Sequence, residues 1–292
     1  MITLTSAREE RLPVTTQVTL LDGTPSTRTS GEGKTSNVPM IRQRPRSIPV
    51  KGLSRPIEVK FASTESEWEQ AFALAAARYS ARGYESPGAS RLRFTPYHAL
   101  PETMTLVAKH EGKVVATFSI VMDNRCLGLP IEEVYPEEIA SLRREGRQIA
   151  ETTTLADAGL GVREFIQVFV TLIKVAMQYH RNHGGDTPVI AVNPRHRQFY
   201  TKMLGFQPLG PRRSYAAVQD APAEALWVDY DLLKANAPKM YEEIFGEDVP
   251  WETLFAPKMP RHLIRQFSRQ SNLCNPDQIE DILSFTESSL AA

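Results

Sequence analysis

The sequence predicts an α/β fold with a mixed β-sheet, and two observations lead to this. The stretches 105–110 and 113–123 alternate apolar and polar residues around Glu111 and Gly112, a two-residue connection typical of an antiparallel hairpin. Further along, a strand, a long helix, an all-apolar strand and a second helix follow one another, the pattern of parallel strands joined by a crossover helix. A sheet that contains both arrangements is mixed.

The composition excludes several classes of protein. The 292 residues carry 34 Lys+Arg and 34 Asp+Glu, and this zero net charge argues against nucleic-acid binding. Cys126 and Cys274 are too far apart for a disulfide framework or a CxxC metal site, so we expect no metal and a reducing, cytoplasmic setting. No secretion signal and no apolar run of membrane-spanning length is visible.

Three regions differ in composition. Residues 1–55 contain no aromatic residue and many Ser, Thr and Pro, which predicts a disordered tail. Residues 56–234 carry the strand and helix patterns and are expected to form the folded domain. Residues 235–292 predict short helices, a C-terminal extension that packs on the outside or pairs two copies as a homodimer.

The first half of the folded region predicts two strands and two helices besides the hairpin. Residues 57–62 alternate as a strand does, and Ser66 with Glu69 has the spacing of a capping box that opens a helix. Residues 131–146 are typical of a charged surface helix. Residues 147–156, rich in β-branched side chains, predict the strand that precedes the long helix.

The second half begins with that long, largely buried helix over 162–183, which Gly184 and Gly185 end. The all-apolar run 188–192 predicts a central strand buried on both faces.

Asn193 and Pro194 then form an N-cap and first-turn pair for a helix that Gly205 ends in the left-handed conformation. Residues 214–219 and 226–232 predict the last strands.

Gly159 and Gly161 lie at the junction of the first crossover strand and the long helix. Such a junction leaves backbone N–H groups free at a helix N-terminus, where a phosphate binds. Taken by itself, the Gly-x-Gly pattern more often marks a plain strand-to-helix turn than an anion site.

The order of the stretches TLADAGLGVREF and AVNPRHRQFYTKMLGFQPLG resembles the GNAT superfamily of N-acyltransferases. This resemblance implies a GNAT-like fold in which two parallel strands splay apart, with helices on both faces, and a thioester donor lies in the gap. Ala156, Gly159 and Gly161 occupy the superfamily's phosphate-loop positions, but Ala156 stands where Gln or Arg is usual. A donor with one phosphodiester, such as acyl carrier protein, would need fewer anion contacts than coenzyme A.

Three further stretches, over 97–123, 128–156 and 192–206, resemble the FeeM-type long-chain N-acyl amino acid synthases, relatives of acyl-homoserine lactone synthases. The resemblance covers roughly residues 57–233. It implies transfer of a medium or long acyl chain from an acyl carrier protein thioester, or from acyl-CoA, to the α-amine of an amino acid. The phosphopantetheine thioester would be a substrate, so no tightly bound cofactor is expected.

Two residues are candidates for the chemistry. Glu151 matches the acidic residue of a family strand motif that usually continues to Ser-Arg, where this chain has Thr153 and Thr154 instead. A carboxylate can take the proton that an α-ammonium must lose, although Glu151 could also simply pair with an Arg. The resemblance places Tyr200 near the departing thiolate as a general acid, and core packing beside Phe199 is the alternative.

The donor-binding candidates come from the glycine turn and the NPRH stretch: Leu155, Gly159, Leu160, Gly161, Asn193 and His196. Asn193 could instead serve only as a helix cap, and His196 could be a surface histidine. Basic clusters at 143–147, 195–197 and 212–213 could steer an acidic carrier protein, or nearby carboxylates could neutralise them. Three other functions remain open: an acetyl-CoA-dependent N-acetyltransferase, a catalytically silent acyl-binding module, and autoinducer synthesis. The last needs S-adenosylmethionine as acceptor, and nothing in the sequence specifically indicates an adenosine site.

Overall fold

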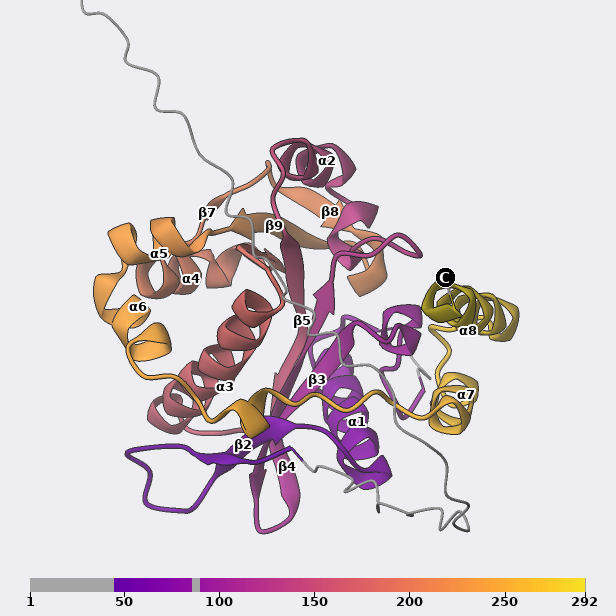
Figure 1. Cartoon of the computed structure of the whole chain (residues 1–292), viewed down its shortest axis with the longest axis horizontal. Helices are drawn as coiled ribbons and strands as arrows, with labels where there is room; N and C mark the ends of the chain where they lie inside the picture. Colours follow the sequence, from indigo (N-terminus) through magenta and orange to yellow (C-terminus); the bar gives the residue numbers. More distant parts are fainter. Residues whose placement is uncertain (1–44, 86–89, 292) are drawn as a thin grey trace, which may run out of the picture. The chain divides into compact units, whose positions relative to one another are not determined.

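A computed structural model describes residues 45–85 and 90–291 of the chain (Figure 1). Within this part, a nine-stranded sheet runs in the order β1-β2-β3-β4-β5-β6-β9-β7, and β8 pairs with β9 off this path. The strands are β1 (Ile48–Pro49), β2 (Glu58–Phe61), β3 (Thr103–His110), β4 (Lys113–Met122), β5 (Ile149–Asp157), β6 (Thr187–Val192), β7 (Gln207–Pro208), β8 (Arg213–Tyr215) and β9 (Ala221–Trp227).

The mixed sheet predicted from the sequence is confirmed. Among the described strands, β5 and β6 pair in parallel and the other pairings are antiparallel. The hairpin of β3 and β4 turns at Glu111 and Gly112, both at positive φ (48° and 78°), as a tight hairpin turn requires. The parallel pairing covers only Ile149–Glu151 against Thr187–Val189, beyond which β5 and β6 separate.

Helices cover both faces of the sheet, and Figure 1 shows α3, α5 and α6 on one side and α1, α7 and α8 on the other. Side chains of β3 alternate between the two apolar cores: Leu106 and Ala108 face the α3 side, and Val107 faces the α1 side. The α-helices are α1 (Glu65–Ala81), α2 (Pro136–Arg144), α3 (Val162–Asn182), α4 (Arg197–Leu204), α5 (Tyr230–Asn236), α6 (Pro238–Phe245), α7 (Arg261–Arg269) and α8 (Pro276–Ala291).

The start of α1 differs from the prediction. Thr64 is the N-cap and accepts a hydrogen bond from the Glu67 backbone N–H, while Ser66 lies inside the helix. The segment holds two Ser/Thr-x-x-Glu spacings in overlapping frames. The earlier one caps the helix because Thr64 has the extended backbone that an N-cap requires.

The helix predicted over 131–146 is shorter in the structure. Its first residues form the 3-10 helix η2 (Pro130–Glu133), and α2 begins only at Pro136, which is suited to a first helical turn but not to a helix interior.

The last strands are also shifted from their predicted positions. Of 214–219, only the first two residues are in β8, and a 3-10 helix, η4 (Ala216–Val218), follows. Of 226–232, β9 includes only the start, because Asp229 caps α5 by accepting a hydrogen bond from the Leu232 N–H at 2.6 Å.

The predicted tail over 1–55 lies mostly outside the described residues. Its final part, 45–55, is described and contains β1, which pairs with β2, and Val50, which is buried in the α3-side core. The predicted C-terminal helices are present as α6, α7 and α8. Their apolar residues join the two cores, Ile244 on the α3 side and Phe267 on the α1 side.

Candidate active site

A cavity of about 560 Å³ opens where β5 and β6 separate. Its walls come from β5, β6, α3 and α4, with the C-terminal end of α1 contributing basic and aromatic side chains. Six of the eight predicted site residues line it: Glu151, Leu155, Leu160, Asn193, His196 and Tyr200. Gly159 and Gly161 do not line it, although their neighbours Leu160 and Val162 do.

Glu151 is the buried carboxyl of this cavity. It is the last β5 residue paired with both β4 and β6, and it is only 2% exposed. Burial raises the pKa of its carboxyl to about 8, although a hydrogen bond from the Ile131 N–H to Oε2 at 2.7 Å lowers it. A carboxyl with such a pKa exchanges a proton with an amine at little cost in free energy.

The 3-10 helix η2 holds Glu151 in place. Ile131 donates its N–H to the carboxylate, and Tyr215 Oη donates to the Pro130 carbonyl at 3.1 Å. Glu132 accepts the Leu129 N–H and pairs with Arg143, which fixes the turn from its outer side. The sequence prediction missed this role because it assigned these residues to a surface helix.

Beyond Glu151, strand β5 contains a bulge. The register with β4 shifts between Thr117 and Ser119, and Thr154 adopts a positive φ of 55°. A β-branched residue is strained in this conformation, and such bulges often lie beside active sites. Thr153 and Thr154 both line the cavity, at the positions where the family motif usually has Ser-Arg.

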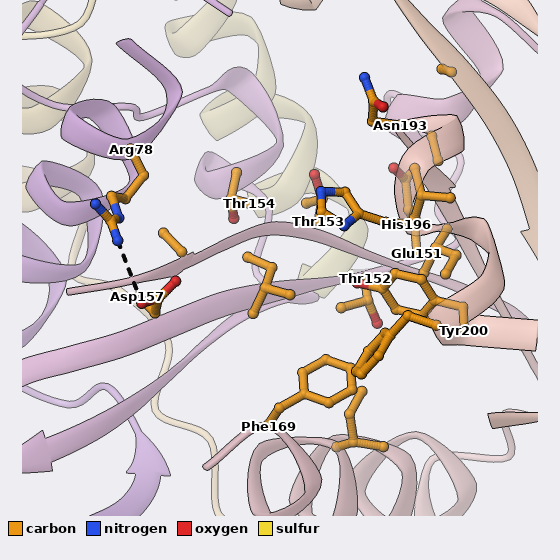
Figure 2. Close-up of a pocket in the computed structure, with 18 of the residues that line it drawn as sticks. Arg78, Glu151, Thr152, Thr153, Thr154, Asp157, Phe169, Asn193, His196 and Tyr200 are labelled. Carbon is orange, nitrogen blue, oxygen red and sulfur yellow. Dashed lines mark hydrogen bonds and ion pairs between the residues drawn. The ribbon is translucent and has the colours of Figure 1, made fainter. Parts of the chain in front are cut away.

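Part of the glycine turn, which was predicted as an anion site, binds a carboxylate of the chain itself. The N–H groups of Gly159 and Leu160 donate to the same Asp157 oxygen, at 2.8 and 2.9 Å. Arg78 of α1 reaches this oxygen at 3.5 Å, the ion pair dashed in Figure 2. The chain therefore places its own carboxylate on N–H groups that were expected to bind phosphate.

Tyr200 lies in an aromatic cluster with Phe169, Phe199 and Phe206, with ring centroids 5.2 to 6.1 Å from its own. Burial raises the pKa of its hydroxyl well above the usual range, so the group stays protonated. Tyr200 and His196 lie at the opposite end of the view in Figure 2 from Arg78 and Asp157.

Asn193 caps the turn before α4 by accepting the Arg195 N–H at 3.2 Å, as the cap interpretation predicted. His196 lines the cavity and is partly buried, and burial together with Arg195 and Arg82 lowers the pKa of its imidazole. A neutral imidazole at this place can accept or donate a hydrogen bond.

Four other charged side chains of the cavity were not predicted: Arg78, Arg82, Arg93 and Asp157. Arg78 lies in α1, Arg82 directly follows that helix, and Arg93 lies in the segment before β3, so only the tertiary fold brings them to β5. The three arginines carried no motif. Asp157, two residues before Gly159, has the spacing of an Asx turn and could have been recognised.

The predicted basic clusters are largely neutralised within the chain. Arg143 pairs with Asp123 and Glu132. The other ion pairs are Arg147–Asp229, Arg197–Glu224, Arg212–Glu224 and Arg213–Glu138. These pairings favour the neutralised interpretation over steering of a carrier protein.

Comparison with known proteins agrees with this geometry. The sequence profile of the family described as N-acyl amino acid synthase FeeM matches residues 70–229, more than half of the chain. The chain belongs to the FeeM family. It is therefore an N-acyltransferase with the GNAT-type fold, as the sequence resemblance implied.

The solved structure of FeeM, an N-acyl amino acid synthase from uncultured soil microbes, is 25% identical with a TM-score of 0.55. The match covers 63% of this chain and 96% of that one. The acyl-homoserine lactone synthase LasI matches at 14% identity and a TM-score of 0.48, over 66% of this chain and 96% of that one. No curated protein sequence matches the chain.

Residues 45–85 and 90–291 include no helix with an apolar stretch of membrane-spanning length. They also contain no group of three or more His, Cys, Asp or Glu side chains that could hold a metal ion.

Proposed function

We propose that this FeeM family member transfers a medium or long acyl chain from the phosphopantetheine thioester of an acyl carrier protein to the α-amine of an amino acid. The observation that carries the proposal is Glu151, a carboxyl with a pKa of about 8, buried where the parallel strands separate. The pKa of the α-ammonium of an amino acid lies within about one to two units of this value, so proton transfer from it to Glu151 costs little free energy.

In the proposed reaction the amine nitrogen bonds to the thioester carbonyl carbon as the carbon–sulfur bond breaks. Glu151 takes the proton that the ammonium loses. The electron pair of the broken bond leaves on sulfur, and the thiolate takes a proton from the protonated Tyr200 hydroxyl. The nitrogen loses a second proton as it becomes the amide nitrogen, and this proton returns through solvent to Tyr200. The products are an N-acyl amino acid and the free thiol of the carrier.

The wall of the cavity that α3 forms favours a long acyl chain as the transferred group. Residues at helical spacing present one apolar stripe to the cavity: Phe165, Ile166, Phe169, Ile173, Ala176 and Met177. From Phe165 to Met177 the helix rises about 18 Å, at 1.5 Å per residue. A two-carbon acetyl group would leave most of this stripe without a partner.

The glycine turn supports a carrier-protein donor over coenzyme A. The pyrophosphate of coenzyme A would meet the Asp157 carboxylate, which already occupies the Gly159 and Leu160 N–H groups. A single phosphodiester carries less charge, and Arg78 beside the turn can attract it.

The test uses the full chain with acyl carrier proteins loaded with acyl groups of several lengths, and the twenty amino acids. Mass spectrometry of the products should show N-acyl amino acids with the wild type and with Glu133→Gln, an exposed carboxyl in the same turn as Ile131. Glu151→Gln should lower the rate by about 10²- to 10⁴-fold.

Three results would contradict the proposal. Activity with acetyl-CoA alone would favour an acetyltransferase. Binding of the acyl carrier without any turnover would favour a silent acyl-binding module. Equal product from the wild type and Glu151→Gln would remove Glu151 from the chemistry.

A further inference from the structure

Arg93 is a buried cation in the wall of the cavity. It follows α1 in the chain and precedes β3, and its neighbours Leu92 and Phe94 are buried in the α1-side core. Arg93 itself lines the cavity and is only 6% exposed. Arginine is rarely buried to this extent without a specific partner for its guanidinium.

The guanidinium is held firmly but is not fully satisfied. Its Nη1 donates to Glu85 Oε1 at 2.7 Å, and its carbon lies 3.9 Å from the centroid of the Tyr79 ring. Its Nε is buried and has no hydrogen-bond partner. The Arg93 guanidinium is thus fixed by Glu85 and Tyr79, and its Nε–H remains unused as a donor. Carboxylates bind arginine through two parallel N–H groups.

Arg93 and Glu151 both influence the pKa of the Tyr79 hydroxyl. Burial raises the pKa of the Tyr79 hydroxyl, and of the charged groups near it, Arg93 lowers that pKa and Glu151 raises it. Tyr79, Arg93 and Glu151 all line the cavity. One cavity therefore contains a buried cation and a buried carboxyl, both near enough to Tyr79 to change the pKa of its hydroxyl.

This pairing of charges is complementary to a zwitterion. An α-amino acid carries its ammonium and its carboxylate on one carbon, so both must be desolvated together when the amine enters the cavity. Glu151 can receive the ammonium, but a carboxylate buried without a counter-charge would be strongly unfavourable.

The other arginines of the cavity are less suited to this role. Arg78 pairs with Asp157 at the glycine turn, and it lies 3.6 Å from the position that a Cβ on Gly159 would take. Arg82 is exposed.

We propose that Arg93 binds the α-carboxylate of the acceptor and so restricts this enzyme to amino acids over other amines. The inference rests on the proposed function and extends it to the acceptor. The β5 motif of this chain has Thr153 and Thr154 in place of the usual Ser-Arg, so it lacks the motif's arginine. Arg93 places another cation in the cavity.

The test compares each of the twenty amino acids with its α-carboxamide, which keeps the amine and the side chain but loses the negative charge. A dodecanoyl acyl carrier protein serves as donor for the full-length wild type, Arg93→Gln and Glu85→Gln. We expect the wild type to prefer the acids, and Arg93→Gln to lower kcat/KM for acids by about 10- to 100-fold with little change for amides. Glu85→Gln should keep the preference, because it leaves the guanidinium in place.

Each of the other possible results would overturn a different part of the proposal. If Arg93→Gln lowers acids and amides equally, or if Glu85→Gln also abolishes the preference, Arg93 acts only through its buried ion pair. If the wild type acylates amides as well as acids, the carboxylate is not recognised, although the acyltransfer stands. This measurement needs no variant and so does not depend on the folding of Arg93→Gln. If the wild type acylates neither, the proposed function itself fails.

Discussion

Among single residues, Glu151 links the burial of the site to its chemistry. Its carboxyl has a pKa of about 8, so it is largely protonated at pH 6 and ionised above pH 9. We expect kcat/KM to rise with pH through a midpoint near 8, because only the ionised form accepts a proton. Two other groups do not titrate in this window: burial lowers the pKa of His98 to about 3 and raises that of Tyr97 to about 12.

The profile can be measured with saturating acyl carrier donor between pH 6 and 9.5, beside Glu133→Gln, which should give the same curve. A rate that does not change across this range would show that another group takes the proton.

The same pKa makes a prediction about stability. The folded protein holds the Glu151 proton up to about pH 8, whereas the unfolded chain releases it near 4.5. Stability from this residue is therefore lost as the pH rises from about 4.5 to about 8. The neutral Glu151→Gln should exceed the wild type in free energy of unfolding by on the order of 3 kcal/mol at pH 8, and by little at pH 5. Urea unfolding at the two pH values tests this, and a difference that does not depend on pH would contradict it.

Among single residues, those that belong to a recognisable motif could be predicted from the sequence. Those that only the tertiary fold brings to the site could not. Glu151 and Tyr200 lie on β5 and α4, in stretches whose order resembles the family, and both line the cavity. Arg93 is distant from both in the sequence, and nothing local distinguishes it from a solvated arginine. The orphaned Nε and the buried pair with Glu85 become visible only in the folded chain.

At the scale of elements, the turn between β5 and α3 carries the choice of donor. Asp157→Asn keeps a side-chain acceptor for the Gly159 and Leu160 N–H groups but removes the negative charge. We expect kcat/KM for acyl-CoA to rise several-fold relative to an acyl carrier protein with the same chain. Asp186→Asn is the matched control, because Asp186 also accepts a backbone N–H, from Gln148, but does not line the cavity. An unchanged ratio in Asp157→Asn would show that the turn does not select the donor.

Helix α3 provides the apolar wall, and its one alanine lies on the cavity side. Ala176 is 4% exposed and lines the cavity between Ile173 and Met177. We expect Ala176→Phe to lower kcat/KM for long acyl chains by at least about tenfold and to spare short ones, because the ring fills the space of the distal carbons. A series of carrier proteins with chains of increasing length tests this, and the short donors control for general damage. Equal losses at all lengths would place the acyl chain elsewhere.

The elements themselves were predicted where periodicity and end signals agree, as in α3 and the β3–β4 hairpin. The errors arose where two local signals compete. In 131–146 the apolar spacing suits a helix, but Pro136 divides it, and Ile131 turns inward to Glu151. In 226–232 the apolar run suits a strand, but Asp229 caps a helix within it.

At the scale of the whole molecule, α3 connects the cavity to the C-terminal segment. One side of α3 lines the cavity. Gln178 of α3, which is 1% exposed, hydrogen-bonds to the end of α6 and to the chain that follows it. Its Nε2 donates to the carbonyls of Ile244 and Glu247 at 2.6 and 3.0 Å, and its Oε1 accepts the Val249 N–H at 2.9 Å. One side chain thus satisfies three backbone groups of the predicted extension, which ties that segment to the wall of the site.

We therefore expect Gln178→Leu to lower the free energy of unfolding by about 3 kcal/mol, because it leaves those three backbone groups buried without partners. Urea unfolding measures the change, and Gln198→Ala, an exposed glutamine on α4, should stay within about 0.5 kcal/mol of the wild type. Because Gln178 does not line the cavity, the variant should keep its acyl-chain preference at temperatures where it remains folded. If Gln178→Leu matches the stability of the wild type, the segment after α6 is held by its apolar contacts alone, with Ile244 and Val249 in the α3-side core.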